Sequence, residues 1–169
     1  MFNAIKAAAD LAAAAQPPVS PPDAEAAPSK TVPAGLTRVR FTIHTIDIHV
    51  SDHKSKLDLP TAADMGTVVT EDAFTGGVEG RGAAAFIILF LAHSAQMDGQ
   101  LAFTGAIDGR RGSVVFRVTG SCFSSINVRL KIIPESATGE LRGIHGGGWY
   151  ASDSPGNGGA EGELEVEYV

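Results

Sequence analysis

Ile126-Asn-Val-Arg-Leu-Lys-Ile132 alternates apolar and polar side chains without a break. This period of two places the aliphatic side chains on one face of an extended strand and the polar ones on the other. Ser113–Cys122 repeats the pattern, with Phe116 and Arg117 on opposite faces. Strands of this kind are half buried and are typical of antiparallel sheets. The two stretches predict that the body of the chain is all-β.

Glycine-containing turns separate the repeats of this pattern over residues 36–169. Met97-Asp98-Gly99 and Asp108–Gly112 are typical of hairpin turns, because glycine and aspartate tolerate positive φ. About seven or eight strands result, spaced about 10 to 15 residues apart. This spacing predicts either a sandwich or an up-and-down barrel. Closure into a barrel would leave no exposed strand edge.

The first strand, expected over residues 37–50, changes phase along its length. Its apolar positions run to Ile43 and then resume one residue out of step at Ile46. An extra residue in one strand of a pair produces such a shift. The sequence therefore predicts a β-bulge near His44 or Thr45.

The first 35 residues differ in composition from the rest of the chain. They hold six of the nine prolines, whereas nineteen of the twenty glycines lie at or after residue 36. Residues 2–16 are alanine-rich and predict a short helix, and Pro17–Pro22 predicts an extended linker. We therefore divide the chain into a flexible N-terminal extension, 1–35, and a β-barrel domain, 36–169. The extension is either a free appendage or a segment that docks on the body or on a partner.

Charge and cysteine content exclude several classes of protein. The formal net charge of −6 offers no basic field for nucleic acid. Cys122 is the single cysteine, so neither an intrachain disulfide nor a thiolate zinc site can form, and we expect a cytoplasmic location. No apolar run reaches the roughly 18 residues of a membrane span. The histidines lack metal-ligand spacing, so we expect no metal and no cofactor.

Ala83–Ala92 is apolar on both faces of its strand. Phe86, Ile88 and Phe90 share one face, and Ile87, Leu89 and Leu91 share the other. A single-layer barrel has only one buried face, so the second face needs a cover. We expect a homo-oligomer, most simply a two-fold dimer, or coverage by the N-terminal extension.

Three glycine-containing segments resemble a known family in their order and spacing. Phe74–Gly82, Ile107–Phe116 and Ala137–Gly146 follow the pattern of domain-of-unknown-function family 3224, and the resemblance extends over residues 67–169. It implies a small antiparallel up-and-down barrel of about eight strands, calycin-like and similar to plant allene oxide cyclases. That group of folds includes barrels that close reactive polyenes or polyketides into rings. The family itself implies no general activity.

An eight-stranded barrel is either filled by side chains or holds one small ligand. The candidate ligand-binding residues are aromatic side chains spread over most of the expected strands: Phe41, Phe74, Phe86, Phe103, Phe116 and Trp149. Glu79 and His145, which lie in two of the family-like segments, are the candidate acid–base residues. The alternatives are a plain hydrophobic core, a solvated acid beside a turn, and a histidine on the strand surface.

These observations suggest a cofactor-free cyclase or isomerase of secondary metabolism. It would bind a hydrophobic, polyene or polyketide-like molecule in the barrel and promote ring closure by holding a reactive conformer. Such catalysis needs shape and one proton donor rather than a catalytic triad, and no nucleophile motif is present. Whether the protein is an enzyme stays open. The alternatives are a non-catalytic hydrophobic ligand-binding barrel and a structural homo-oligomeric barrel with a filled core.

Overall fold

Eight antiparallel strands make up the barrel in the computed structural model, which describes residues 35–53, 64–153 and 159–169. The strands are β1 (Thr37–His53), β2 (Asp64–Gly76), β3 (Val78–Phe90), β4 (Ala95–Ile107), β5 (Arg110–Cys122), β6 (Ile126–Ile133), β7 (Ile144–Ser152) and β8 (Gly159–Tyr168). Two short 3₁₀ turns, η1 (Pro134–Ser136) and η2 (Gly139–Leu141), connect β6 to β7. The all-β prediction is confirmed.

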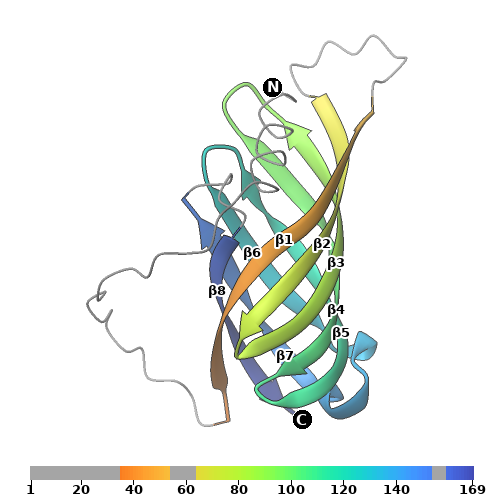
Figure 1. The fold of residues 1–169 in the computed structure, drawn as a ribbon, viewed down its shortest axis with the longest axis vertical. Coiled ribbons are helices and arrows are strands. Elements are labelled where there is room, and N and C mark those ends of the chain that lie inside the picture. The colour runs from red at the N-terminus through yellow and green to blue at the C-terminus, as the bar shows by residue number, and fades with distance from the viewer. Residues whose placement is uncertain (1–34, 54–63, 154–158) are drawn as a thin grey trace, which may run out of the picture.

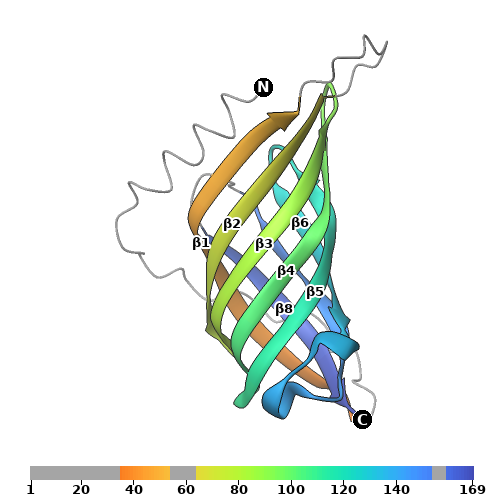
Figure 2. The same ribbon diagram turned by 90° about the vertical axis from the view of Figure 1, so that its right-hand side faces the viewer.

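The sheet closes on itself, because β1 pairs with both β2 and β8. Each strand otherwise pairs with its neighbours in sequence, so the order is that of an up-and-down barrel rather than a sandwich. The strands run at an angle to the long axis of the barrel (Figures 1 and 2). In the part of the chain that is described, every strand pairs with two neighbours, so the sheet has no edge strand.

Alternation along each strand separates an apolar interior from a polar exterior. On β6 the predicted pattern holds, with Val128, Leu130 and Ile132 buried while Arg129 and Lys131 are exposed. On the other strands as well, the apolar side chains of one face point into the same interior. The hydrophobic effect thus fixes which way each strand faces.

Large apolar side chains fill one end of the barrel, which we call the plugged end. The side chains there are at most 1% exposed: Val78, Ile107, Leu141, Ile144 and Val166. Leu141 comes from the 3₁₀ turn η2, which packs against β5. The opposite end, which we call the loop end, carries the connections between β1 and β2, β3 and β4, β5 and β6, and β7 and β8.

The predicted bulge in β1 is confirmed, one residue further along than expected. The register with β2 shifts between Thr45 and Asp47, so Ile46 is the extra residue and is 51% exposed. Pairing of β1 with β8 ends at His44, just before this shift. Beyond the bulge β1 continues with β2 alone.

The predicted turn at Met97-Asp98-Gly99 is wrong. These residues lie within β4, and the chain reverses instead at residues 91–94, where the Leu91 amide donates to the Ser94 carbonyl at 2.8 Å. Gly99 is needed in the strand because a Cβ atom there would collide with the carbonyl oxygen of Ala85 and come within 2.8 Å of both Cα and the ring of its pairing partner Phe86. The glycine allows the backbone of β3 and the Phe86 ring to lie close to β4, rather than forming a turn.

The expected helix and proline linker of the N-terminal extension lie outside the described residues. Across the described ranges, no helix is long and apolar enough to cross a membrane.

Candidate functional site

A carboxyl group lies inside the barrel on β2. Val68, Thr70, Asp72 and Phe74 share the inward phase of this strand, and Asp72 is only 4% exposed. Thr70 and Asp72 precede Phe74 in sequence and lie nearer than Phe74 to the loop end, where β2 begins. An aspartate is rarely buried this far unless its oxygens are satisfied. Its hydrogen bonds therefore decide what it can do.

Two threonine hydroxyls hold the Asp72 carboxyl. Thr45 Oγ1 donates to Asp72 Oδ1 at 2.8 Å, and Thr70 Oγ1 donates to Asp72 Oδ2 at 2.7 Å. Thr45 is the residue just before the bulged Ile46, and it is the direct cross-strand partner of Asp72. Bulges are a common means of aiming a side chain. Thr45, the last β1 residue before the bulge, is thus held opposite the Asp72 carboxyl.

Burial raises the pKa of Asp72 above its ordinary range, because the charged form loses its hydration. The hydroxyls of Thr70 and Thr45 act in the opposite direction, since they donate to the carboxylate, but they offset only part of the shift. Among the described residues, no cation is recorded as an ion-pair partner of Asp72. The carboxyl therefore stays protonated to a higher pH than an exposed aspartic acid and can donate a proton there.

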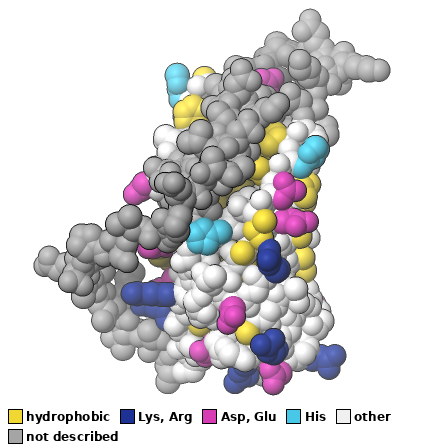
Figure 3. All heavy atoms as spheres, in the orientation of Figure 1, with side chains coloured by type: hydrophobic (Ala, Val, Ile, Leu, Met, Phe, Trp, Pro, Cys, Tyr) yellow, Lys and Arg dark blue, Asp and Glu magenta, His cyan; other side chains and the backbone are white. Residues whose placement is uncertain are grey.

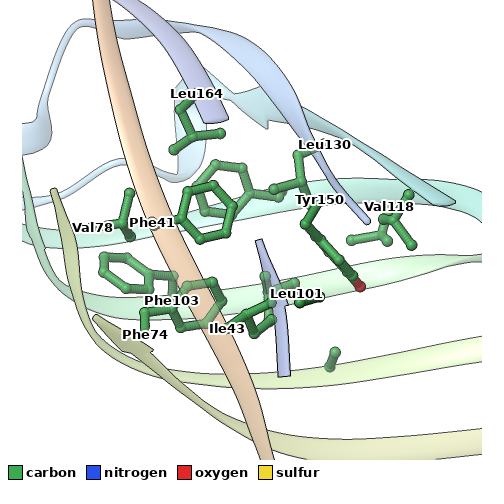
Figure 4. Close-up of a cluster of buried hydrophobic side chains, with 14 of the residues drawn as sticks. Phe41, Ile43, Phe74, Val78, Leu101, Phe103, Val118, Leu130, Tyr150 and Leu164 are labelled. Atoms are coloured by element: carbon green, nitrogen blue, oxygen red, sulfur yellow. The ribbon is translucent and has the colours of Figure 1, made fainter. Parts of the chain in front are cut away.

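Tyr150 brings a second proton donor to the same interior from β7. The side chain is 8% exposed, and its hydroxyl points away from Phe41, Phe74 and Phe103 (Figure 4). Burial raises the pKa of the Tyr150 phenol, and the charges of Asp72 and Cys122 raise it further. Because β7 and β2 are separated by β8 and β1, the interaction between Tyr150 and Asp72 crosses the interior.

Cys122 completes what we call the interior polar cluster, defined as Thr45, Thr70, Asp72, Cys122 and Tyr150. The thiol is partly buried at the end of β5, and burial raises its pKa. A protonated thiol is a weak nucleophile, so the arrangement does not favour covalent catalysis by Cys122. The cluster can hold a polar atom of a ligand and exchange a proton with it.

Five of the six predicted ligand-binding residues face the interior: Phe41, Phe74, Phe86, Phe103 and Phe116. Four of their rings form a continuous chain, with centroids 5.8 Å apart for Phe41 and Phe74, 5.3 Å for Phe74 and Phe103, and 6.4 Å for Phe103 and Phe116. Edge-on and tilted contacts of this kind stabilise a packed core. Phe74 is the next inward-facing residue after Asp72 on β2, so this chain of rings adjoins the interior polar cluster.

The structure places Trp149 outside the barrel. It is 49% exposed and pairs with Arg129 and Glu163, which also face outward. Tyr150, the next residue, takes the interior position instead. An apolar side chain does not always face the interior, and here the alternation along β7 decides which of the two neighbouring side chains is buried.

Neither predicted acid–base residue joins the interior polar cluster. Glu79 is exposed and follows the inward-facing Val78 on β3. His145 is half-buried and pairs with Glu167 on the outer phase of β7, because Ile144 before it faces inward. The two residues are on strands that do not pair with each other.

The sequence carries a signal for Asp72 that the search for family-like segments passed over. Val68, Thr70, Asp72 and Phe74 alternate with the more exposed Val69, Glu71 and Ala73. A carboxylate in the same phase as valine and phenylalanine must enter the core if the strand is half buried. No comparable signal marks Tyr150, because Trp149 beside it is equally suited to a core.

Residues 40–164 match the family model described as protein of unknown function (DUF3224). The chain belongs to the DUF3224 family. A crystal structure of a DUF3224 protein with unknown function from Shewanella oneidensis MR-1 is similar, with a TM-score of 0.63 and 20% sequence identity. The match covers 79% of this chain and 98% of that one, so the two DUF3224 proteins share the fold. Comparison with curated proteins finds no match.

Replacing Asp72 by asparagine tests the electrostatic account of this DUF3224 barrel. The raised pKa of Asp72 means that its contribution to stability is fully present below the unfolded-state pKa and is lost as the pH rises through the folded-state pKa. At neutral pH, Asp72→Asn should therefore raise the free energy of unfolding, by about 1 kcal/mol. Denaturant titrations at several pH values measure this, and the gain should vanish in acid. A variant that is less stable than the wild type at neutral pH and equally so in acid would contradict the account.

Proposed function

We propose that the protein is a cofactor-free isomerase or cyclase that acts on a small hydrophobic molecule inside the barrel. The observation that carries this proposal is the Asp72 carboxyl, which is 4% exposed, held by two threonine hydroxyls and raised in pKa by burial. Perturbed carboxyls in apolar surroundings are typical of proton-transfer sites. The fold adds support by analogy, since it resembles barrels that close polyenes or polyketides into rings.

The proposed reaction needs only one proton donor and a shaped apolar wall. The protonated Asp72 gives its proton to a carbonyl oxygen or an alkene carbon of the ligand, which leaves a cationic carbon. The π electrons of a second alkene in the ligand form the new carbon–carbon bond to that carbon, and the positive charge moves to the other carbon of this alkene. A neighbouring carbon then loses a proton to the Asp72 carboxylate, the C–H electron pair forms an alkene, and the product has the mass of the substrate. Phenylalanine rings beside the cluster would hold the reacting atoms close together, which removes much of the entropic barrier.

Asp72 takes the acid–base role in this proposal in place of Glu79 and His145, which lie on the outer phase of their strands. Thr45 and Thr70 are positioning residues, because they fix the carboxyl and supply no proton to the ligand. Tyr150 is a second hydrogen-bond donor for a ligand oxygen, and its raised pKa keeps it protonated.

A structural barrel with a filled core is the second candidate. The chain of rings from Phe41 to Phe116 favours it, because those side chains occupy interior volume that a ligand would otherwise use. A carrier that binds a hydrophobic molecule without turnover would share the interior site with the enzyme. The two ligand-binding proposals differ only in whether Asp72 transfers a proton.

The test is incubation with linear polyenes and linear polyketide-like molecules, followed by chromatography and mass spectrometry. We expect new isomers of unchanged mass with the wild type. Asp72→Asn should form them at least about a hundredfold more slowly, which is the usual cost of losing an acid–base group. Glu79→Gln serves as the matched control and should keep the wild-type rate. Isomers formed equally well by Asp72→Asn would contradict the assignment, and binding without any new isomer would favour the carrier.

We also propose that the protein forms a two-fold dimer through the outer face of β2 and β3. Three large apolar side chains are exposed there, Met65 at 51%, Val69 at 44% and Ile87 at 60%, and Met65 pairs with the half-buried Leu89. Apolar side chains, yellow in Figure 3, are visible on the barrel wall where β1, β2 and β3 lie. Such strips commonly mark contacts between subunits.

Ile87→Lys places a charge at the centre of this strip and should convert the dimer to a monomer. The matched control is Phe123→Lys, because Phe123 is also half exposed but lies in the connection between β5 and β6. Sedimentation velocity gives the mass in solution. The dimer is disproved if the wild type already sediments as a single chain, or if Ile87→Lys still sediments as a pair.

A further inference from the structure

A groove of about 1260 Å³ lies on the outer wall of the barrel and is lined mainly by residues of β5 to β8, whereas the proposed dimer strip lies on β2 and β3. We call it the outer groove. Trp149, Gly147, Arg129, Lys131 and Leu36 are among the residues that line it. Tyr150 of the interior polar cluster also borders the groove, but its side chain is buried in the barrel. The side chains exposed in the groove do not belong to the cluster, so this surface needs its own explanation.

Strand register arranges the groove in two rows. In one row Trp149 lies between Glu163 of β8 and Arg129 of β6. In the next row Gly147 takes the same place between Glu165 and Lys131. Because Gly147 has no side chain, the wall is hollow beside the half-exposed Trp149 ring. The hollow has an acidic side on β8 and a basic side on β6.

The acidic side is neutralised within the barrel, whereas the basic side is not. Arg38 Nε lies 2.9 Å from Glu163 Oε1, and Arg38 Nη2 lies 2.6 Å from Glu165 Oε1. In the part of the chain that the structure describes, neither Arg129 nor Lys131 has an ion pair. An exposed tryptophan beside uncompensated cations is the composition of a binding surface. Its chemistry fits an extended segment that carries acidic side chains.

We propose that residues 1–34 of the same chain dock in the outer groove, with Asp23 and Glu25 facing Arg129 and Lys131. The described chain begins beside the groove, since Leu36 lines it. Across the sheet Arg38 pairs with Glu165, Glu165 pairs with Gly147, and Gly147 pairs with Lys131. Lys131 therefore lies three strand spacings, or about 14 Å, from Arg38.

The N-terminal residues are long enough to reach these cations. Glu25 precedes Leu36 by 36 − 25 = 11 residues, and a proline-rich chain extends by about 3.1 Å per residue, or roughly 34 Å in all. A tethered segment also acts at an effective concentration of about a millimolar, so even weak contacts hold it in place. An acidic segment of another molecule would have to compete with this local concentration.

Trp149 is the only tryptophan in the chain, so its fluorescence reports directly on the groove. We expect Asp23→Lys combined with Glu25→Lys to release the segment, raising acrylamide quenching of Trp149 about twofold and shifting its emission to the red. Arg129→Glu with Lys131→Glu should do the same, and the four substitutions together should restore the wild-type quenching, because the attraction is then reversed in sign on both sides.

Glu79→Lys combined with Glu135→Lys is the matched control, because it changes the net charge equally at exposed residues that do not line the groove. It should leave the quenching unchanged. Docking within one chain also predicts quenching that is independent of protein concentration over roughly a hundredfold range. The proposal would be overturned if Asp23→Lys/Glu25→Lys left the quenching unchanged, or if the four substitutions failed to restore it. Shielding of Trp149 that grows with protein concentration would also overturn it, because the groove would then bind a second copy of the chain.

Discussion

Pairing of β1 with β8 is the interaction on which the rest of this structure depends. It runs from Thr37 opposite Val166 to His44 opposite Gly159, and it turns a meander of strands into a closed wall. A closed wall surrounds its interior with sheet on all sides. The burial of Asp72, and with it the raised pKa, follows from that closure.

The bulge at Ile46 connects this closure to the candidate site. β1 leaves β8 at His44, takes the extra residue, and then continues along β2. Thr45 is thereby fixed opposite Asp72, where its hydroxyl donates to the carboxyl. A buried carboxyl costs stability at neutral pH, and proteins commonly keep such groups where function needs them. This cost in stability is the physical basis of the proposed function.

Much of the fold could be predicted from the sequence because one face of each strand is buried. The alternation in β6 and the phase shift in β1 both report this burial directly, and both are found in the structure. The turn expected at Asp98-Gly99 was wrong because the dipeptide has two physical uses. Its glycine allows the backbone of β3 and the Phe86 ring to lie close to β4, and nothing in the local sequence distinguishes that use from a turn.

The candidate site could be predicted less well, since side-chain chemistry and strand phase were weighed separately. Aromatic type alone suggested Trp149 for the interior, whereas phase assigns that position to Tyr150. Glu79 and His145 were chosen for their place in family-like segments, although the alternation of β2 already places Asp72 beside Phe74. The interaction between Tyr150 and Asp72 spans non-adjacent strands, so it depends on closure and leaves no trace in local sequence.

The most direct measurement is a titration of the Asp72 carboxyl by carbon-13 nuclear magnetic resonance in the full chain, with the signal assigned by its loss in Asp72→Asn. Our account predicts a midpoint clearly above about 3.9, the ordinary value for aspartic acid, because burial disfavours the charged form. A midpoint at or below that value would show that the carboxyl is solvated or paired with a cation, and would contradict the assignment of Asp72 as the interior acid.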